Sequence, residues 1–233
     1  MVFILNLETS TTVCSVSLTA DGKLLALREQ FDAKSHASQL IPFIAEVLVE
    51  SGIKPKQLSA IAVNKGPGSY TGLRIGVSTA KGLAYALEIP VIAIDSLYSM
   101  ASGYLDKYSE NFNKVGVILC PMIDARRMEV YSSVYNLHLE LLREIKAEII
   151  IPESFKSELE SSNIHFFGDG AMKCAEIIKN ENATFINGFL PSSAYMGKIS
   201  YKLFIEGHFE NLAYFEPFYL KDFVATIPTN KML

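Results

Sequence analysis

The sequence contains little cysteine, no tryptophan and no long apolar run. Its three cysteines, Cys14, Cys120 and Cys174, lie far apart and form no CxxC pair, so neither a disulfide framework nor a thiolate metal site is expected. No apolar segment approaches the roughly 18 residues of a membrane-spanning helix, and no basic residue precedes Lys23, as a secretory signal requires. These absences predict a protein of the reducing cytoplasm that neither spans nor crosses a membrane.

The excess of acidic over basic residues is also small. The formal net charge is −4, the isoelectric point is near 5.6, and like charges do not gather in blocks. A nucleic-acid-binding protein usually carries a basic patch or stripe, so any contact with nucleic acid is expected to be local or indirect. Apolar residues are plentiful, at 49% of 233 residues, which is enough for one large domain or two lobes.

One order of elements occurs twice along the chain. Three short apolar runs within residues 2–31 precede a helix from Ser35, a strand, a helix after Gly68, a strand and a helix from Ser96. Three more strands follow, and then helices at 153–160, 169–180 and 192–206 alternate with short strands. The predicted fold is α/β, with two ribonuclease-H-like lobes of the actin, Hsp70 and sugar-kinase type, each βββαβαβα with a mixed sheet.

The polar stretch DKYSENFNK marks the expected boundary between the lobes. Residues 1–106 are predicted to form the N-terminal lobe, and residues 107–210 a degenerate C-terminal lobe of the same kind. Residues 211–233 include YFEPFYLKDF, which is too aromatic for a disordered segment, and are predicted to form a tail that packs back on a lobe.

The segment VNKGPGSYTGLRIGVSTAKGLAYAL, residues 63–87, opens like a phosphate-binding loop. Its third glycine, Gly72, comes one residue too late for the dinucleotide motif, and Leu73 stands where a P-loop has lysine, so both nucleotide motifs fail. The amides that follow Gly68 still face the start of a helix, where an anion can bind. Three basic residues near this turn are candidate contacts for RNA or another anion: Lys65, Arg74 and Lys81.

The smallest side chains recur at every fourth position from residue 72, which places them on one face of the helix. Two glycines inside a helix cost about 1 kcal/mol each relative to alanine, so the close approach of another backbone is expected to offset that cost. The ridge packs on its own sheet or on the helix from Ser35, or it contacts another subunit, or it does both. The subunit reading predicts an interface formed by nine residues: Leu40, Ile44, Val47, Gly72, Leu73, Gly76, Val77, Ala80 and Ala84.

Five segments together resemble the TsaB (YeaZ) family: ILNLETS, HASQLIPFI, AVNKGPGSYTGLRIGVSTAKGLA, PVIAIDSL and DARRMEVY. The similarity covers the first lobe and reaches Tyr131. It implies a bacterial partner in making threonylcarbamoyladenosine at position 37 of transfer RNA. It also implies self-association as a homodimer, a heterodimer with the catalytic paralogue TsaD, and recruitment of the ATPase TsaE. Transfer RNA would be reached indirectly, through the complex.

The same resemblance separates this chain from the catalytic paralogue. That relative carries a His-x-x-x-His metal pair, whereas Ser96 and Met100 stand at the two positions here. His36 is expected to have a capping or packing role. In ATP-using members of this fold the first hairpin carries an Asp and a Gly, but here Glu8, Thr9 and Ser10 form a degenerate phosphate loop. No metal, cofactor or catalytic residue is predicted.

Two functions of different kinds remain open, beside a third possibility. The first is a non-catalytic scaffold or activating subunit that binds TsaD through the helical interface. The alternative is an independent ATP- or metal-dependent enzyme, kinase-like or glycopeptidase-like, that uses the cleft between the lobes. The third possibility is direct binding of transfer RNA through Lys65, Arg74, Lys81, Arg126 and Arg127, which is expected to be weak for the chain alone because its net charge is negative. A mixed-charge turn in the second lobe, with Asp124, Arg126, Arg127 and Glu129, fits a solvated turn with ion pairs better than a site.

Overall fold

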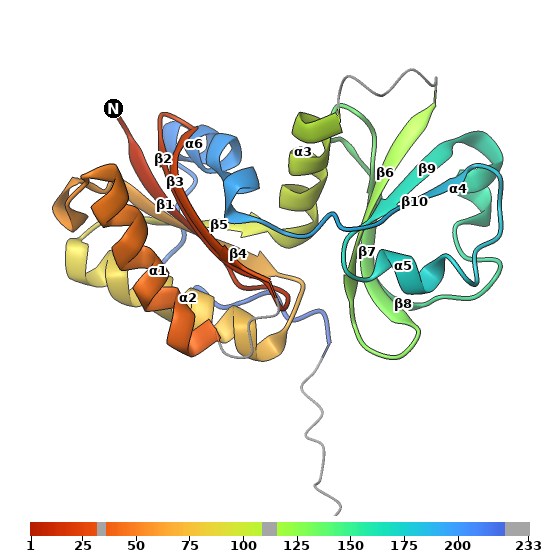
Figure 1. Cartoon of the computed structure of the whole chain (residues 1–233), viewed down its shortest axis with the longest axis horizontal. Coiled ribbons are helices and arrows are strands. Elements are labelled where there is room, and N and C mark those ends of the chain that lie inside the picture. The colour runs from red at the N-terminus through yellow and green to blue at the C-terminus, as the bar shows by residue number, and fades with distance from the viewer. Residues whose placement is uncertain (32–35, 109–115, 222–233) are drawn as a thin grey trace, which may run out of the picture.

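Two five-stranded sheets, one in each lobe, form the framework of the protein (Figure 1). The computed structural model describes residues 1–31, 36–108 and 116–221. The first sheet has the strand order β3-β2-β1-β4-β5 and the second β10-β9-β6-β7-β8. In each, three antiparallel strands are extended by two parallel ones. The predicted fold of two ribonuclease-H-like lobes with mixed sheets is confirmed.

The predicted order of elements holds in both halves. The first half contains β1 (Phe3–Glu8), β2 (Cys14–Ala20), β3 (Lys23–Gln30), α1 (His36–Ser51), β4 (Ala60–Gly66), α2 (Tyr70–Leu87), β5 (Val91–Asp95) and α3 (Ser96–Tyr108). The second half contains β6 (Val117–Asp124), β7 (Glu129–Tyr135), β8 (Leu141–Ile149), α4 (Lys156–Ser161), β9 (Asn163–Phe167), α5 (Ala171–Cys174), β10 (Ala183–Ile186) and α6 (Gly197–Ile205). Helix α5 is shorter than predicted because hydrogen-bonded turns after Cys174 already bring Ile178 into the core.

Short polar residues and glycines set the ends of the helices around the first sheet. Helix α1 ends at Gly52, whose φ of +69° a residue with a side chain rarely adopts. The Ser69 hydroxyl accepts a hydrogen bond from the Gly72 amide and caps α2. The Asp95 carboxylate accepts hydrogen bonds from two amides in the first turn of α3. Ser35, the expected cap of α1, lies outside the described residues.

Helices α3 and α6 exchange lobes, which corrects the predicted boundaries at residues 106 and 210. Leu97, Met100 and Tyr104 of α3 pack into the core of the second sheet, although all three lie within the predicted N-terminal lobe of residues 1–106. Helix α6 lies within residues 107–210 but packs against the first sheet, where Ile199 contacts the cluster around Ile4. Figure 1 shows α3 between the two sheets and α6 over the first one. An apolar helix face fits either lobe, so helix spacing alone does not tell which one it covers.

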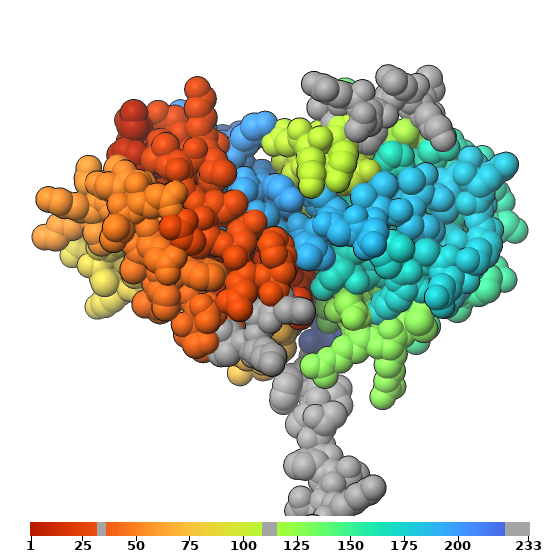
Figure 2. All heavy atoms as spheres, viewed as in Figure 1, coloured from red at the N-terminus to blue at the C-terminus, as the bar shows by residue number. Residues whose placement is uncertain are grey.

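Polar contacts between distant residues tie the segment before α6 to the first sheet. The Ser15 hydroxyl lies 2.7 Å from the Ser193 hydroxyl, and the Ser192 hydroxyl donates to the Glu29 carboxylate. Figure 2 shows residues of the last third of the chain, in blue, between the orange and cyan lobes. The three cysteines are free and buried.

Residues 211–221, the C-terminal strap, run back along the first lobe. Phe215 is buried in the core beneath α1 and α2, and the Phe218 amide donates to the carbonyl oxygen of Lys65. At its end Lys221 forms an ion pair with Glu129 of the second lobe. Residues 211–221 therefore contact both lobes, and residues 222–233 lie outside the described residues.

Candidate functional site

The nine residues predicted to form the subunit interface lie in the interior of the first lobe. All are buried, and six of them lie in one core cluster with Leu5, Leu7 and Val63 of the first sheet: Leu40, Ile44, Val47, Val77, Ala80 and Ala84. They cannot provide a docking surface in this conformation, so that prediction is wrong for these side chains. Of the two alternatives for the ridge, packing on its own sheet is the one that the structure supports.

The ridge of small residues is bare because α2 rests directly on the loop after β1. A Cβ atom added at Gly72 would lie 2.1 Å from the carbonyl oxygen of Thr9, and one at Gly76 would lie 2.3 Å from the Thr9 hydroxyl. The same hydroxyl donates a 2.8 Å hydrogen bond to the carbonyl oxygen of Gly72. Gly68 is held equally close, since its added Cβ would lie 2.2 Å from the carbonyl oxygen of Ser10. The glycines therefore lock α2 onto its own chain.

The degenerate phosphate loop, Glu8, Thr9 and Ser10, is filled by a carboxyl group of its own, that of Glu8. The Glu8 carboxylate accepts a 2.5 Å hydrogen bond from the Ser10 amide, the kind of backbone donor that a phosphate oxygen uses in related loops. Burial raises the pKa of Glu8 to about 7, and hydrogen bonds from Ser10 offset part of that rise. Asp169 of the second lobe adds a smaller repulsion that also raises the pKa of Glu8. The loop is thus closed by side chains and by α2, with no glycine to open it.

The raised pKa of Glu8 makes stability depend on pH. Between pH 4.5 and about 7 the folded protein holds a proton on Glu8 that the unfolded chain has lost. This contribution is fully present below pH 4.5 and disappears as the pH rises through 7, by at most roughly 3 kcal/mol. Glu8→Gln is expected to flatten this part of the profile. Urea unfolding of both proteins from pH 5 to 8 measures the difference, and parallel profiles would contradict the assignment.

Burial also raises the pKa of Asp169, to about 6, so this carboxyl adds a slope of the same sign over a lower range. Asp169→Asn serves as the second variant of the series. Because the two ranges overlap, the double variant identifies the share of each group.

The three predicted anion contacts all meet the C-terminal strap. The Lys65 carbonyl oxygen accepts from the strap, the Arg74 guanidinium donates to the Tyr219 hydroxyl at 3.2 Å, and the Lys81 ammonium donates to the carbonyl oxygen of Phe215 at 2.9 Å. Tyr219 also packs on Tyr70, with ring centroids 4.7 Å apart. The structure therefore brings these residues together around the strap, and their contact with RNA stays a prediction.

His36, Ser96 and Met100 are all buried inside the protein. The His36 ring is buried, with Nε2 2.8 Å from the carbonyl oxygen of Thr11, and burial lowers its pKa. Ser96 and Met100 are buried at the start of α3. In residues 1–31, 36–108 and 116–221, no three His, Cys, Asp or Glu side chains gather as a metal site. No helix in this part of the chain is long and apolar enough to cross a membrane.

The outward side of α1 and α2 carries exposed apolar residues that the sequence analysis did not predict as a surface. On α1, Val49 and Ile41 are 81% and 55% exposed, and on α2 Tyr85 is 80% exposed. Together with the small exposed residues between them they form the outer face: Ile41, Ala45, Val49, Ser78, Gly82 and Tyr85. Figure 1 shows α1 and α2 side by side on one face of the first sheet. The spacing of Ile41, Ala45 and Val49 by four residues was the available signal, since the buried stripe of α1 already accounts for its core contacts.

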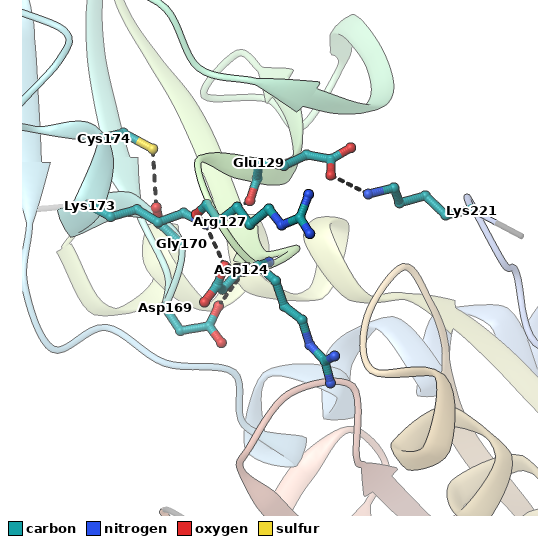
Figure 3. Close-up of polar contacts among 9 residues, drawn as sticks. Asp124, Arg127, Glu129, Asp169, Gly170, Lys173, Cys174 and Lys221 are labelled. Carbon is teal, nitrogen blue, oxygen red and sulfur yellow. Dashed lines mark hydrogen bonds and ion pairs between the residues drawn. The ribbon is translucent and has the colours of Figure 1, made fainter. Parts of the chain in front are cut away.

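The mixed-charge turn between β6 and β7 holds two ion pairs. Lys173 pairs with Asp124 at 2.5 Å, and Lys221 pairs with Glu129 (Figure 3). The Asp169 carboxylate accepts a 3.0 Å hydrogen bond from the Asp124 amide. The acidic residues of the turn therefore form ion pairs, but with Lys173 and Lys221 and not with Arg126 or Arg127 of the predicted cluster.

The fold defines the class of protein: it is a two-lobed α/β protein with duplicated ribonuclease-H-like cores, whose first loop, Glu8 to Ser10, is closed. Residues 30–229 match a family model described as TsaD, tRNA N6-adenosine threonylcarbamoyltransferase. The chain is 30% identical over 232 residues to the tRNA threonylcarbamoyladenosine biosynthesis protein TsaB of Haemophilus influenzae, covering 95% of this chain and 94% of that protein. The Escherichia coli TsaB protein is 31% identical, with 95% and 96% covered. This chain belongs to the TsaB (YeaZ) family.

A solved structure agrees with this assignment. YeaZ from Pseudomonas aeruginosa is 26% identical and superposes with a TM-score of 0.79, over 94% of this chain and 100% of that one. The similarity therefore extends through both lobes, although the motifs that carry it in the sequence end at Tyr131.

Proposed function

We propose that this chain is a non-catalytic, activating subunit of the cytoplasmic complex that makes threonylcarbamoyladenosine at position 37 of transfer RNA. The relatives named above are described as biosynthesis proteins of this modification, which supports the pathway. The subunit binds a TsaD partner through the outer face and joins TsaE in the same complex. In the absence of TsaD, a second copy of the chain occupies the same face as a homodimer.

The observation that carries the proposal is the outer face itself. Core residues of α1 and α2 already point inward, so Val49 and Tyr85, which are 81% and 80% exposed, add little to the packing of the described chain. Small residues between them, Ala45 and Gly82, allow the helices of a partner to approach closely. Aromatic and apolar residues surrounded by polar ones are typical of helical interfaces.

The alternative, an independent enzyme in the interlobe cleft, receives less support. The amide that a phosphate needs is bonded to Glu8, and the adjoining backbone is covered by Gly68 and Gly72 of the α2 segment. A nucleotide would have to displace a buried carboxyl and part of α2. Calorimetry of the isolated chain with ATP, and separately with zinc or iron, tests this alternative; micromolar binding, about −8 kcal/mol, would revive it.

The direct test is reconstitution. The chain, its TsaD and TsaE partners from the same organism, a threonylcarbamoyl donor and an unmodified transfer RNA are combined, and the modified nucleoside is measured with and without this chain. Full modification is expected only when the chain is present. Equal modification by the partners alone would rule out the activating role.

A further inference from the structure

The turn between β6 and β7 presents two adjacent arginines that the chain itself does not use. Arg126 and Arg127 both have positive φ, 71° and 52°, a backbone conformation that favours asparagine or glycine. Both are exposed. Neither guanidinium forms a hydrogen bond or ion pair with another residue of the described chain, and Figure 3 shows Arg127 projecting from the turn without a partner.

The turn is nevertheless rigidly built. The Arg126 amide donates a 2.8 Å hydrogen bond to the Asp124 carboxylate. From below, the Lys173 ammonium donates to the same carboxylate and to the carbonyl oxygens of Arg127 and Glu129, at 2.5, 2.8 and 2.7 Å. Both arginines therefore leave the turn from a backbone that is already ordered, so little conformational freedom is lost when a ligand binds.

No acidic residue of the described turn is left to pair with the two guanidiniums. Lys173 is paired with Asp124 and Lys221 with Glu129, so the acidic residues on the hairpin already have cationic partners. Asp169 lies beneath the turn, where it accepts from a backbone amide, and burial raises the pKa of its carboxyl. Two exposed guanidiniums on one turn offer the paired N–H donors that contact phosphate oxygens in a bidentate manner.

We propose that Arg126 and Arg127 contact the phosphate backbone of transfer RNA when the chain is assembled in its complex. This inference rests on the proposed function and adds a direct RNA contact on the second lobe. With a net charge of −4 the chain as a whole does not attract RNA, so the contact positions RNA that the complex has already bound.

The test replaces the pair by the residues that the backbone favours, Arg126→Asn with Arg127→Gly. This variant removes both charges and is expected to keep or raise the melting temperature, because the turn becomes easier to form. In the reconstituted complex, its affinity for an unmodified transfer RNA transcript at about 0.1 M salt is expected to fall about tenfold. The plot of log affinity against log salt should become shallower by about 1 to 2.

Two further variants complete the experiment. Lys198→Gln with Lys202→Gln removes two exposed cations of α6, whose side chains are 71% and 72% exposed, and is expected to leave RNA affinity unchanged. Arg126→Lys with Arg127→Lys keeps the charge and should retain most of the salt dependence.

The possible failures are distinguishable. Unchanged RNA affinity and salt dependence in the Asn-Gly variant would overturn the RNA contact while leaving the proposed function intact. Loss of TsaD or TsaE binding with unchanged RNA affinity would also overturn it, and would assign the arginines to an acidic protein surface. If the unaltered complex modifies no transfer RNA, the proposed function itself fails.

Discussion

Gly76→Leu is expected to destabilise the protein by about 3 kcal/mol or more, which lowers the melting temperature of a chain of this size by roughly 6–12 °C. The added Cβ alone would lie 2.3 Å from the Thr9 hydroxyl and 3.4 Å from Val63. Thr9 can move away only by losing its hydrogen bond to the Gly72 carbonyl oxygen. The helix propensity gained by replacing a glycine, about 1 kcal/mol, does not offset this overpacking.

Gly82→Leu is the matched control, because it makes the same change on the same helix. No atom lies within 4 Å of a Cβ added at Gly82, so this variant is expected to be as stable as the unaltered protein or slightly more stable. Thermal melts followed by circular dichroism compare the two. A Gly76→Leu protein as stable as Gly82→Leu would mean that α2 does not rest on the Thr9 loop.

A double-mutant cycle identifies the atom responsible. Gly76→Ala places a methyl group against the Thr9 hydroxyl, and Thr9→Ala removes that hydroxyl. The combined variant is expected to be more stable than the sum of the single effects predicts, by about 1 kcal/mol or more. Additive effects would indicate that the clash involves a different part of the core.

The second large effect is expected on partner binding. Val49→Arg places a charge at the most exposed apolar residue of the outer face, and the affinity for the TsaD partner should fall at least about 100-fold, since an unpaired charge would be buried in the interface. Val49 is 81% exposed in the isolated chain, so the melting temperature is expected to change little. Tyr85→Ala should weaken binding by about 30-fold, as is typical of an interface tyrosine. Isothermal titration with the purified partner measures both.

Ile205→Arg provides the comparison for Val49→Arg. Ile205 is an apolar residue, 63% exposed, on α6, which covers the opposite side of the first sheet. Partner affinity is expected to stay unchanged in this variant. Equal losses in Val49→Arg and Ile205→Arg, or no loss in either, would remove the outer face as the binding surface. Sedimentation of the variants without TsaD tests whether the homodimer uses the same face.

The periodicity of apolar and small residues predicted most helices and strands, but it did not show what each helix face packs against. The helical repeat of Gly72, Gly76, Ala80 and Ala84 was readable, and the structure places all four on one buried face. A stripe of small residues allows close approach of a sheet as well as of another helix, so the sequence did not show which of them it contacts. In the structure the stripe packs on Thr9, more than 60 positions earlier in the chain.

Contacts between distant segments explain the other differences. Lys65, Arg74 and Lys81 looked like free cations near a helix start, but the strap that contacts them is over 130 residues away in sequence. Helices α3 and α6 were placed in the lobes nearest to them in sequence, whereas each packs on the other one. Both errors follow from assuming that neighbours in sequence are neighbours in space.

The amino-acid sequence alone determined the α/β class, the duplicated order of strands and helices, the glycine-free first loop and the family, because these depend on residue type and local spacing. Only the tertiary structure decided which side of α1 and α2 faces outward, which lobe each crossing helix completes and which cations remain unpaired. These properties depend on which surfaces meet when the chain folds. Whether a helix face is buried or a charge is paired depends on a second segment of the chain, and the sequence of the first segment does not show which segment that is.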